Sequence, residues 1–338
     1  MHFLPQQQSP HVLSDPEHNE DAFVVSLPMD NDGTGKSTDK HNDFALVQSL
    51  DIIAPLGNNP RLYGQSAACN ALSDIYAMGG TAYTAMNILS FSSCDTPLEV
   101  IQEILQGAYD KIKEAGAVAC GGHTMESKEL RFGLSVTGLV PKNHFSQNKN
   151  LHTGDILILT KPLGTGVLST GIRGKWEHAE QAEEELFSYT TRLNAHAAKI
   201  IQEFHLEAST DITGFGLIGH SLEMAKASQK TVVLEQAKIP FMNYVLEYAQ
   251  NGLIPKRCYD NKRFASAFVH IGENVPELVA VLCHDPQTSG GILLAVPPRN
   301  AEKVTKALCD CGEKAYSIGF VTELQKQHAQ QPHFLSLV

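Results

Sequence analysis

The sequence predicts a two-domain protein in which an α/β unit is followed by an α+β unit. Its 338 residues exceed what one hydrophobic core usually organises, so two domains are expected. The apolar content of 42% is that of a globular chain. From about residue 45 onward, apolar runs of strand type alternate with segments of helical periodicity, and this alternation indicates mixed domains.

The polar segment PKNHFSQNKN marks the expected domain boundary. We expect residues 1–20 to form a flexible N-terminal segment, residues 21–150 the first domain and residues 151–338 the second. The first domain should open with the short apolar segment AFVVSL.

The clearest helix of the first half is predicted over residues 97–115. Thr96, Pro97 and Glu99 suit the N-cap, N1 and N3 positions of a capping box, and Gly116 supplies the stop. The segments AVACGGH and LRFGLSVTGLV that follow are typical of strands.

The second half opens with DILILTKPLGTGVL, a strand that leads into a glycine-rich turn. Helices are predicted near residues 189–204 and 217–227, and KTVVLE and GILLAV are predicted strands. Both halves therefore mix helices and strands.

Composition excludes several classes of function. The formal charge of −11 and the lack of Lys/Arg clusters argue against a nucleic-acid partner. No apolar run reaches the roughly 18 residues of a membrane span, and the N-terminus has no signal-peptide pattern, so we expect a cytoplasmic protein with no membrane partner. Seven cysteines without regular spacing do not form a disulfide framework.

Four aspartates stand beside strongly apolar or glycine-rich sequence: Asp21, Asp51, Asp74 and Asp211. A buried carboxylate usually caps a backbone, pairs with a base or holds a metal ion, and for each aspartate alone the first two readings stay open. Four such residues in a chain poor in Lys and Arg favour Mg²⁺, which combines carboxylates with the phosphates of a substrate.

Asn70 precedes Asp74 by four residues on an expected helix, so both side chains should lie on one face. Asn70 is either a substrate contact or an ordinary polar residue. Glycine pairs, such as Gly121 with Gly122, are either phosphate cradles or simple turns. Among the histidines, His123 is the candidate site residue, although structural histidines are common.

Other motifs are absent or incomplete. Residues 33–37 resemble the end of a P-loop, but Asp30 stands where that motif requires glycine, so we interpret the run as a surface loop. The sequence contains no nucleophile elbow, no H-E-x-x-H motif and no protein-kinase signature.

Five motifs in register resemble the selenophosphate synthetases (selenide, water dikinases) of the aminoimidazole ribonucleotide synthetase superfamily: NALSDIYAMGG, AGAVACGGHT, TKPLGTGVL, TDITGFGLIGH and DPQTSGG. The resemblance runs from about Asp21 to Phe320. It implies that the first domain binds ATP and forms a homodimer through its sheet. The family makes selenophosphate, AMP and phosphate from ATP, selenide and water.

The resemblance also implies roles for residues. Asp21, Asp51, Asp74 and Asp211 would be Mg²⁺ ligands, with Asp51 and Asp74 also facing the nucleotide phosphates. Gly122, His123 and Thr124 would contact ATP and could belong to the neighbouring subunit, and His18, Asn19 and Glu20 would line the site just before Asp21. The alternatives within the superfamily are the thiamine phosphate kinases and the aminoimidazole ribonucleotide synthetases. The motifs NALSDIYAMGG and DPQTSGG argue against both alternatives.

One departure from the family concerns the N-terminus. Family members carry a catalytic Cys or selenocysteine and an essential Lys upstream of the position of Asp21, whereas residues 1–20 contain neither. Three explanations stay open: the segment is missing from this chain; the chain is a divergent ATP-using paralogue or a silent regulatory partner; or another residue, such as Cys69, substitutes. The catalytic residues are therefore left unassigned.

Overall fold

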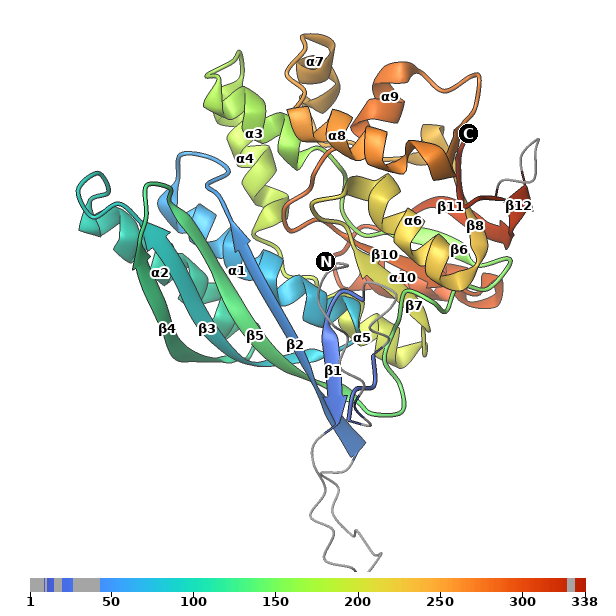
Figure 1. Ribbon diagram of the computed structural model, residues 1–338, viewed down its shortest axis with the longest axis horizontal. Coiled ribbons are helices and arrows are strands. Elements are labelled where there is room, and N and C mark those ends of the chain that lie inside the picture. The colour runs from blue at the N-terminus through green and yellow to red at the C-terminus, as the bar shows by residue number, and fades with distance from the viewer. Residues whose placement is uncertain (1–8, 10, 15–19, 27–42, 327–331) are drawn as a thin grey trace, which may run out of the picture.

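Two β-sheets with helices packed on them form the part of the chain that the computed structural model describes (Figure 1). The described residues are 9, 11–14, 20–26, 43–326 and 332–338. Among them, no helix is long and apolar enough to cross a membrane.

The first sheet has the strand order β1-β2-β5-β3-β4. Its bounds are β1 Phe23–Ser26, β2 Phe44–Ile53, β3 Thr81–Phe91, β4 Val118–Glu126 and β5 Arg131–Pro141. All neighbours are antiparallel except β3 and β4, which are parallel because α2 (Leu98–Glu114) connects them as a crossover. The sheet therefore contains one βαβ unit within an otherwise antiparallel arrangement.

Helix α1 (Pro60–Ala77) and α2 lie on one face of this sheet (Figure 1). Their backbones touch, because a Cβ atom on Gly64 would lie 2.0 Å from the carbonyl oxygen of Ile104. Glycine is thus the residue that permits this close approach. The core beneath the helices includes Leu72 and Ile75 of α1 and Val136 of β5.

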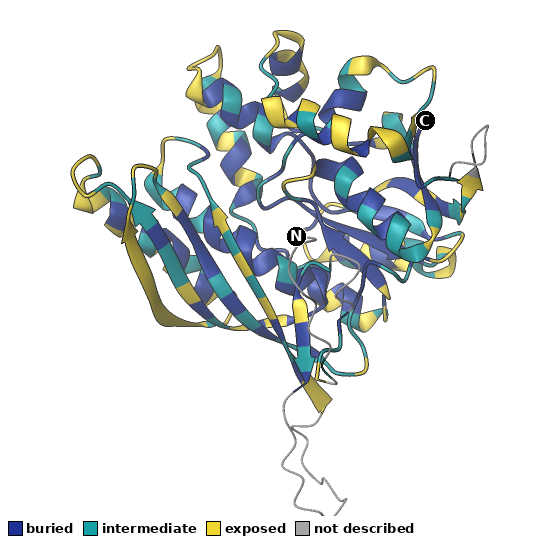
Figure 2. Ribbon diagram, viewed as in Figure 1, coloured by how far each residue is buried: buried dark blue, intermediate teal, exposed yellow. Residues whose placement is uncertain are grey.

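The opposite face of the first sheet is open, and strand β4 is exposed along its whole length (Figure 2). Large apolar side chains are exposed on these strands: Leu50, Tyr83, Met86, Val118 and Met125. Exposed apolar residues on a sheet face and an unpaired edge strand are both features of a surface that another protein covers.

The second sheet has the order β7-β10-β6-β11-β8-β14-β9. Its bounds are β6 Ile156–Leu159, β7 Ala208–Asp211, β8 Lys230–Leu234, β9 Val269–Ile271, β10 Ile292–Val296, β11 Tyr316–Glu323 and β14 Leu335–Leu337. Strands β12 (Gln325–Lys326) and β13 (Pro332–His333) form a separate pair. Strand β14 runs parallel to β8 and β9, and the other pairs are antiparallel.

The helices of this second half are α3 Thr165–Arg173, α4 Ala179–Thr190, α5 Ala195–Glu203, α6 Gly216–Ser228, α7 Val245–Gln250, α8 Lys256–Ala265, α9 Glu277–Leu282 and α10 Ala301–Asp310. Short 3₁₀ turns lie at Gln236–Lys238, Ser266–Phe268 and Pro298–Asn300. The two halves meet at α1: Ser209 Oγ of β7 donates to the carbonyl of Ala77 at 2.7 Å.

The predicted start of the helix over residues 97–115 was wrong. This helix begins at Leu98, with Pro97 at the N-cap position and no side-chain cap. The capping box does not form because the amide of Thr96 is already bonded to the carbonyl of Ser92, which holds Thr96 in the preceding turn. The predicted stop is confirmed, since the helix ends at Glu114 and Gly116 has φ +72°.

The helix predicted near 189–204 is α5, but it begins only at Ala195, because residues 189–190 are the end of α4, a helix that was not predicted. The break lies at residues 191–194, where tertiary hydrogen bonds replace helical ones. The carbonyl of Arg192 accepts from Lys161 Nζ at 2.8 Å, and the side-chain Nδ2 of Asn194 donates to Ser73 Oγ at 2.8 Å. The helix predicted over 217–227 is confirmed as α6.

Candidate functional site

At the centre of the site, two residues of strand β2 face two residues of helix α1. Ser49 and Asp51 lie two residues apart on β2, and Asn70 and Asp74 lie four residues apart on α1. Two strand residues span about 6.6 Å and four helical residues about 6 Å, so the two pairs can face each other. Ser49 Oγ donates to Asp74 Oδ2, and Asn70 Nδ2 donates to Asp51 Oδ2 at 2.6 Å.

The other two aspartates come from different halves of the chain. Asp21 precedes β1, and Asp211 is the buried last residue of β7, where it pairs with Ile292 of β10. Thr210 Oγ1 donates to Asp21 Oδ1 at 2.7 Å, which joins the two halves of the molecule at this point. The structure therefore brings all four predicted aspartates together around the end of α1.

Burial raises the pKa of every one of these carboxyl groups, and the charge of Asp211 raises the pKa of the other three further. The pKa of Asp51 rises to about 7 because of burial and then the charge of Asp211, partly offset by the hydrogen bond from Asn70. Burial, followed by the charge of Asp211, also raises the pKa values of Asp21 and Asp74 well above their usual range. Burial raises the pKa of Asp211 as well, against the hydrogen bond from Ser73. Negative charge at this position is therefore unfavourable until a cation balances it.

The residues present fit a hard cation. Asp21 Oδ2 and Asp211 Oδ2 are both buried and meet no hydrogen-bond donor among the described residues. A buried carboxylate oxygen without a donor is costly, and a cation would satisfy it. Within the same described ranges, no group of three or more His, Cys, Asp or Glu side chains is arranged to hold a metal ion by itself. Mg²⁺ commonly binds through one or two carboxylates, with waters and the oxygens of a phosphate substrate as its other ligands.

Lys161 is a site residue that the sequence reasoning missed. It is 1% exposed, and its Nζ donates to the carbonyls of Ser289 and Arg192 at 2.9 and 2.8 Å. The amide of Ser289 in turn donates to Asn70 Oδ1 at 2.8 Å, so Lys161 supports Asn70 and, through it, Asp51. Burial lowers the pKa of Lys161 to about 8. The sequence signal that could have identified Lys161 is its position in the motif TKPLGTGVL.

Gly122, His123 and Thr124 do not join the aspartates within one chain. The pairing register places Asp51, Leu134, Asn87 and Gly122 in one row across four neighbouring strands. Three strand spacings, about 14 Å, therefore separate β2 from β4. A Cβ atom on Gly122 would lie 2.1 Å from the carbonyl oxygen of Asn87, which explains the glycine there. His123 and Thr124 follow it on the exposed edge strand.

The remaining candidates are placed as follows. His18 and Asn19 lie outside the described residues, as does the P-loop-like run at 33–37. Glu20 accepts a hydrogen bond from the amide of Asn148 at 3.0 Å. Cys69 is fully buried, and burial raises the pKa of its thiol to about 12, so it is not placed to act as a thiolate.

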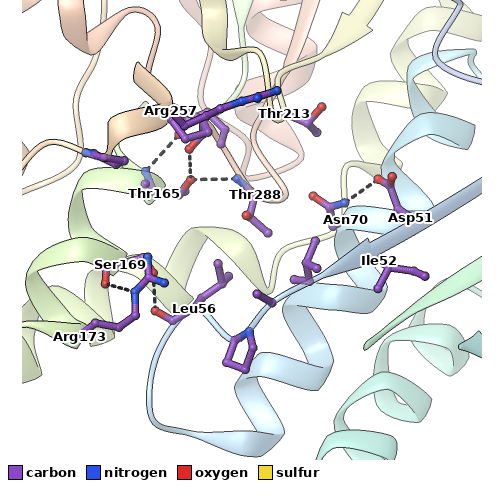
Figure 3. Close-up of a pocket in the computed structure, with 18 residues that line it drawn as sticks. Asp51, Ile52, Leu56, Asn70, Thr165, Ser169, Arg173, Thr213, Arg257 and Thr288 are labelled. Atoms are coloured by element: carbon purple, nitrogen blue, oxygen red, sulfur yellow. Dashed lines mark hydrogen bonds between the residues drawn. The ribbon is translucent and has the colours of Figure 1, made fainter. Parts of the chain in front are cut away.

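A cavity of about 450 Å³ lies directly beside Asp51 and Asn70 (Figure 3). Its wall includes the segment that follows β2, the N-terminal half of α3 and the loop at 286–288, so both halves of the chain contribute. Arg173 and Arg257 also line it, two residues that the sequence reasoning did not single out. They are far apart in sequence, and no local pattern connects them.

Family models match both halves of the chain. The model described as "AIR synthase related protein, N-terminal domain" matches residues 19–140, and the corresponding C-terminal domain model matches residues 152–330. The chain is 44% identical over 310 residues to "Selenide, water dikinase" of Nitratidesulfovibrio vulgaris (strain DSM 19637 / Miyazaki F), covering 92% of this chain and 85% of the relative. It is 40% identical over 296 residues to the protein of that name from Clostridioides difficile (strain 630), covering 87% and 84%.

Solved structures of the same fold include kinases. Thiamine monophosphate kinase from Aquifex aeolicus superposes with a TM-score of 0.63 at 16% identity, covering 87% of this chain and 88% of that one. The E. coli hydrogenase maturation protein HypE superposes with a TM-score of 0.64 at 19% identity, covering 86% and 84%. The predicted two-domain fold of mixed α/β and α+β type is confirmed. The chain belongs to the selenide, water dikinases, phosphotransferases of the AIR synthase related superfamily.

Proposed function

We propose that the protein makes selenophosphate from selenide, water and ATP, with AMP and phosphate as the other products and Mg²⁺ as the cofactor. One observation carries this proposal: Asp21, Asp51, Asp74 and Asp211 converge from both halves of the chain, and two of their buried oxygens meet no donor among the described residues. The names of the relatives supply the reaction.

The four aspartates would hold the Mg²⁺ ions against the phosphates of ATP. When bound, the ions would neutralise the charge of the polyphosphate and of the transition state, which is the main requirement of phosphoryl transfer. The chain itself supplies positioning. Ser49 and Asn70 fix the carboxylates of Asp74 and Asp51 by hydrogen bonds, and Thr210 fixes Asp21.

We further propose that the active form is a homodimer that pairs the open faces of the first sheets. Gly122, His123 and Thr124 lie about 14 Å from the β2 strand of their own chain, so they would complete the nucleotide site of the partner instead. The exposed apolar residues of this face support the pairing. In this arrangement residues 21–150 form the ATP-binding and dimerisation domain, and residues 151–338 the second domain. A cytoplasmic location is proposed with it.

A second candidate function rests on the burial of Cys69, the cysteine that the sequence offered as a substitute thiol. The chain would then be a paralogue that uses ATP without selenide, or a silent partner that regulates an active subunit. The buried thiol of Cys69 offers no replacement, because burial raises its pKa to about 12.

The deciding experiment is to incubate the purified chain with MgATP, with and without selenide. AMP formation would be followed by chromatography and selenophosphate by phosphorus NMR. Selenide-dependent AMP and selenophosphate support the proposal. AMP formation that ignores selenide favours the divergent paralogue, and failure to bind nucleotide favours the silent partner.

A further inference from the structure

The cavity beside Asp51 has an acidic side and a basic side. Asp51 and Asn70 lie at one side, and Arg173 of α3 and Arg257 of α8 lie at the other (Figure 3). The volume of about 450 Å³ is within the range of small-molecule sites. The cavity therefore extends from the carboxylate cluster to the two arginine side chains.

These two arginines have no acidic partner among the described residues of a strongly acidic chain. Of the seven arginines in the sequence, Arg61, Arg131, Arg192 and Arg263 form ion pairs with carboxylates. Arg173, Arg257 and Arg299 form no ion pair with any described residue, and the first two of these line one cavity. With a formal charge of −11, carboxylates are abundant, so two guanidinium groups that line one cavity without an ion pair to any described residue indicate an external anion.

The contacts of each arginine leave its donors available. Arg173 Nε donates to the carbonyl of Ser169 at 3.2 Å, which fixes the side chain and leaves its terminal nitrogens without an acceptor among the described residues. The guanidinium carbon of Arg257 lies 5.7 Å from the centre of the Phe215 ring. A ring contact of this kind orients the guanidinium group without using its N–H donors.

The backbone near the cavity does not provide an alternative anion site. The first amides of α3 are occupied, because Gln287 Oε1 accepts from Gly164 and Thr165, and Asp285 Oδ2 accepts from Gly166 at 3.0 Å. The carboxylate of Asp285 also offsets the positive end of the helix. Attraction for an anion therefore depends on the two arginine side chains.

We propose that this cavity is an oxyanion subsite that binds inorganic phosphate, or a small molecule with an equivalent oxyanion group, between Arg173 and Arg257. Guanidinium groups bind phosphate oxygens through paired, charge-assisted hydrogen bonds. The inference deepens the proposed function and rests on it, since the phosphate released from ATP is the anion that forms next to Asp51. The subsite would receive that product on the side away from the carboxylates.

The test measures binding of inorganic phosphate to the full chain, with Mg²⁺ and without nucleotide, by titration calorimetry and thermal shift. Arg173→Met and Arg257→Met should each weaken phosphate binding about 10-fold or more, while Arg173→Lys and Arg257→Lys should keep part of the affinity. Arg299→Met is the matched control, because Arg299 is also without an ion pair among the described residues but lies in a different pocket. It should bind phosphate like the parent chain.

Equal phosphate affinity in Arg257→Met and the parent chain would overturn the subsite, and so would an equal loss in Arg299→Met. A nucleotide-induced thermal shift shows that each variant is folded. If Arg173→Met fails that check, Arg257→Met decides alone. Selenide-dependent AMP formation is measured separately. If phosphate binding depends on the arginines but no selenide-dependent AMP forms, only the proposed reaction is rejected. If selenide-dependent AMP forms but phosphate binding does not depend on the arginines, only the subsite is rejected.

Discussion

Asn70 donates a hydrogen bond of 2.6 Å to the carboxylate of Asp51 and accepts one of 2.8 Å from the amide of Ser289. One side chain on α1 thereby connects strand β2 of the first sheet to the loop before β10 of the second. The position of Asp51 depends on this connection, because Asp51 sits at the junction of the carboxylate cluster and the cavity.

Replacing Asn70 by alanine should therefore affect nucleotide use more than folding. We expect Asn70→Ala to lose about 1–3 kcal/mol of unfolding free energy, since the amide of Ser289 is left without its acceptor. The kcat/KM for MgATP should fall about 10-fold or more as Asp51 loses its orientation. Asn251→Ala is the control, because Asn251 is exposed and bonds only within its own helix turn. Unchanged kcat/KM in Asn70→Ala would contradict the positioning role.

Asp74→Asn should separate activity from stability. Neutralising Asp74 would remove a proposed ligand for Mg²⁺, so turnover of MgATP should fall at least 100-fold. The metal-free chain should unfold at the same or a higher temperature, because the substitution removes a carboxyl group whose pKa is raised by burial and then by the charge of Asp211. Initial rates and thermal melts check both parts, with Asp110→Asn on the surface of α2 as control. Near-normal ATP turnover in Asp74→Asn would reject the assignment.

Mg²⁺ alone should stabilise the protein. A cation that meets the buried oxygens of Asp21 and Asp211 binds the native state only, so the melting temperature should rise with Mg²⁺ concentration and return to its starting value with EDTA. Asp211→Asn should abolish most of this rise. A rise of the same size in that variant would show that Mg²⁺ binds elsewhere.

The open face of the first sheet should control both assembly and nucleotide binding. We expect sedimentation to give twice the chain mass for the parent protein, and Tyr83→Glu to shift it towards a monomer with weaker ATP binding. Tyr259→Glu is a matched control, because Tyr83 and Tyr259 are 58% and 51% exposed but Tyr259 lies on α8 in the second half. A monomeric parent chain that binds ATP normally would refute the shared site.

His284 should make stability depend on pH below neutrality. Burial, followed by the charge of Lys262, lowers its pKa to about 4, against the hydrogen bond between Nδ1 and the carbonyl of Ala280. The unfolded chain therefore binds a proton from about pH 6.5 downward, whereas the native chain does not until about pH 4. The contribution of this residue is complete above pH 6.5 and falls by about 3 kcal/mol as the pH drops to 4.

Denaturant unfolding of His284→Gln across this pH range checks the prediction. The difference in unfolding free energy between the parent chain and the variant should shrink as the pH falls from 6.5 to 4. His152→Gln, at an exposed histidine, should show no such change. Parallel curves for the parent chain and His284→Gln would contradict the assignment.

Local patterns predicted much of the fold, because strand and helix periodicity repeat within a few residues. They located α2, α6, β8 and β10, and they singled out the four aspartates. They placed the starts of α2 and α5 too early and did not predict α4. Neither the turn at Ser92 nor the hydrogen bonds of Arg192 and Asn194 leave a local signature.

By itself, the sequence determined the family, the two-domain fold and the unusual apolar setting of four carboxylates. Only the tertiary structure decided that these carboxylates meet and that Lys161 supports Asn70. It also decided that two arginines without an ion pair to any described residue line the cavity beside Asp51. The physical reason is distance along the chain: Thr210 and Asp21 are 189 residues apart, yet their side chains share a hydrogen bond. Such contacts are fixed by how sheets and helices pack, and no short window of sequence contains both partners.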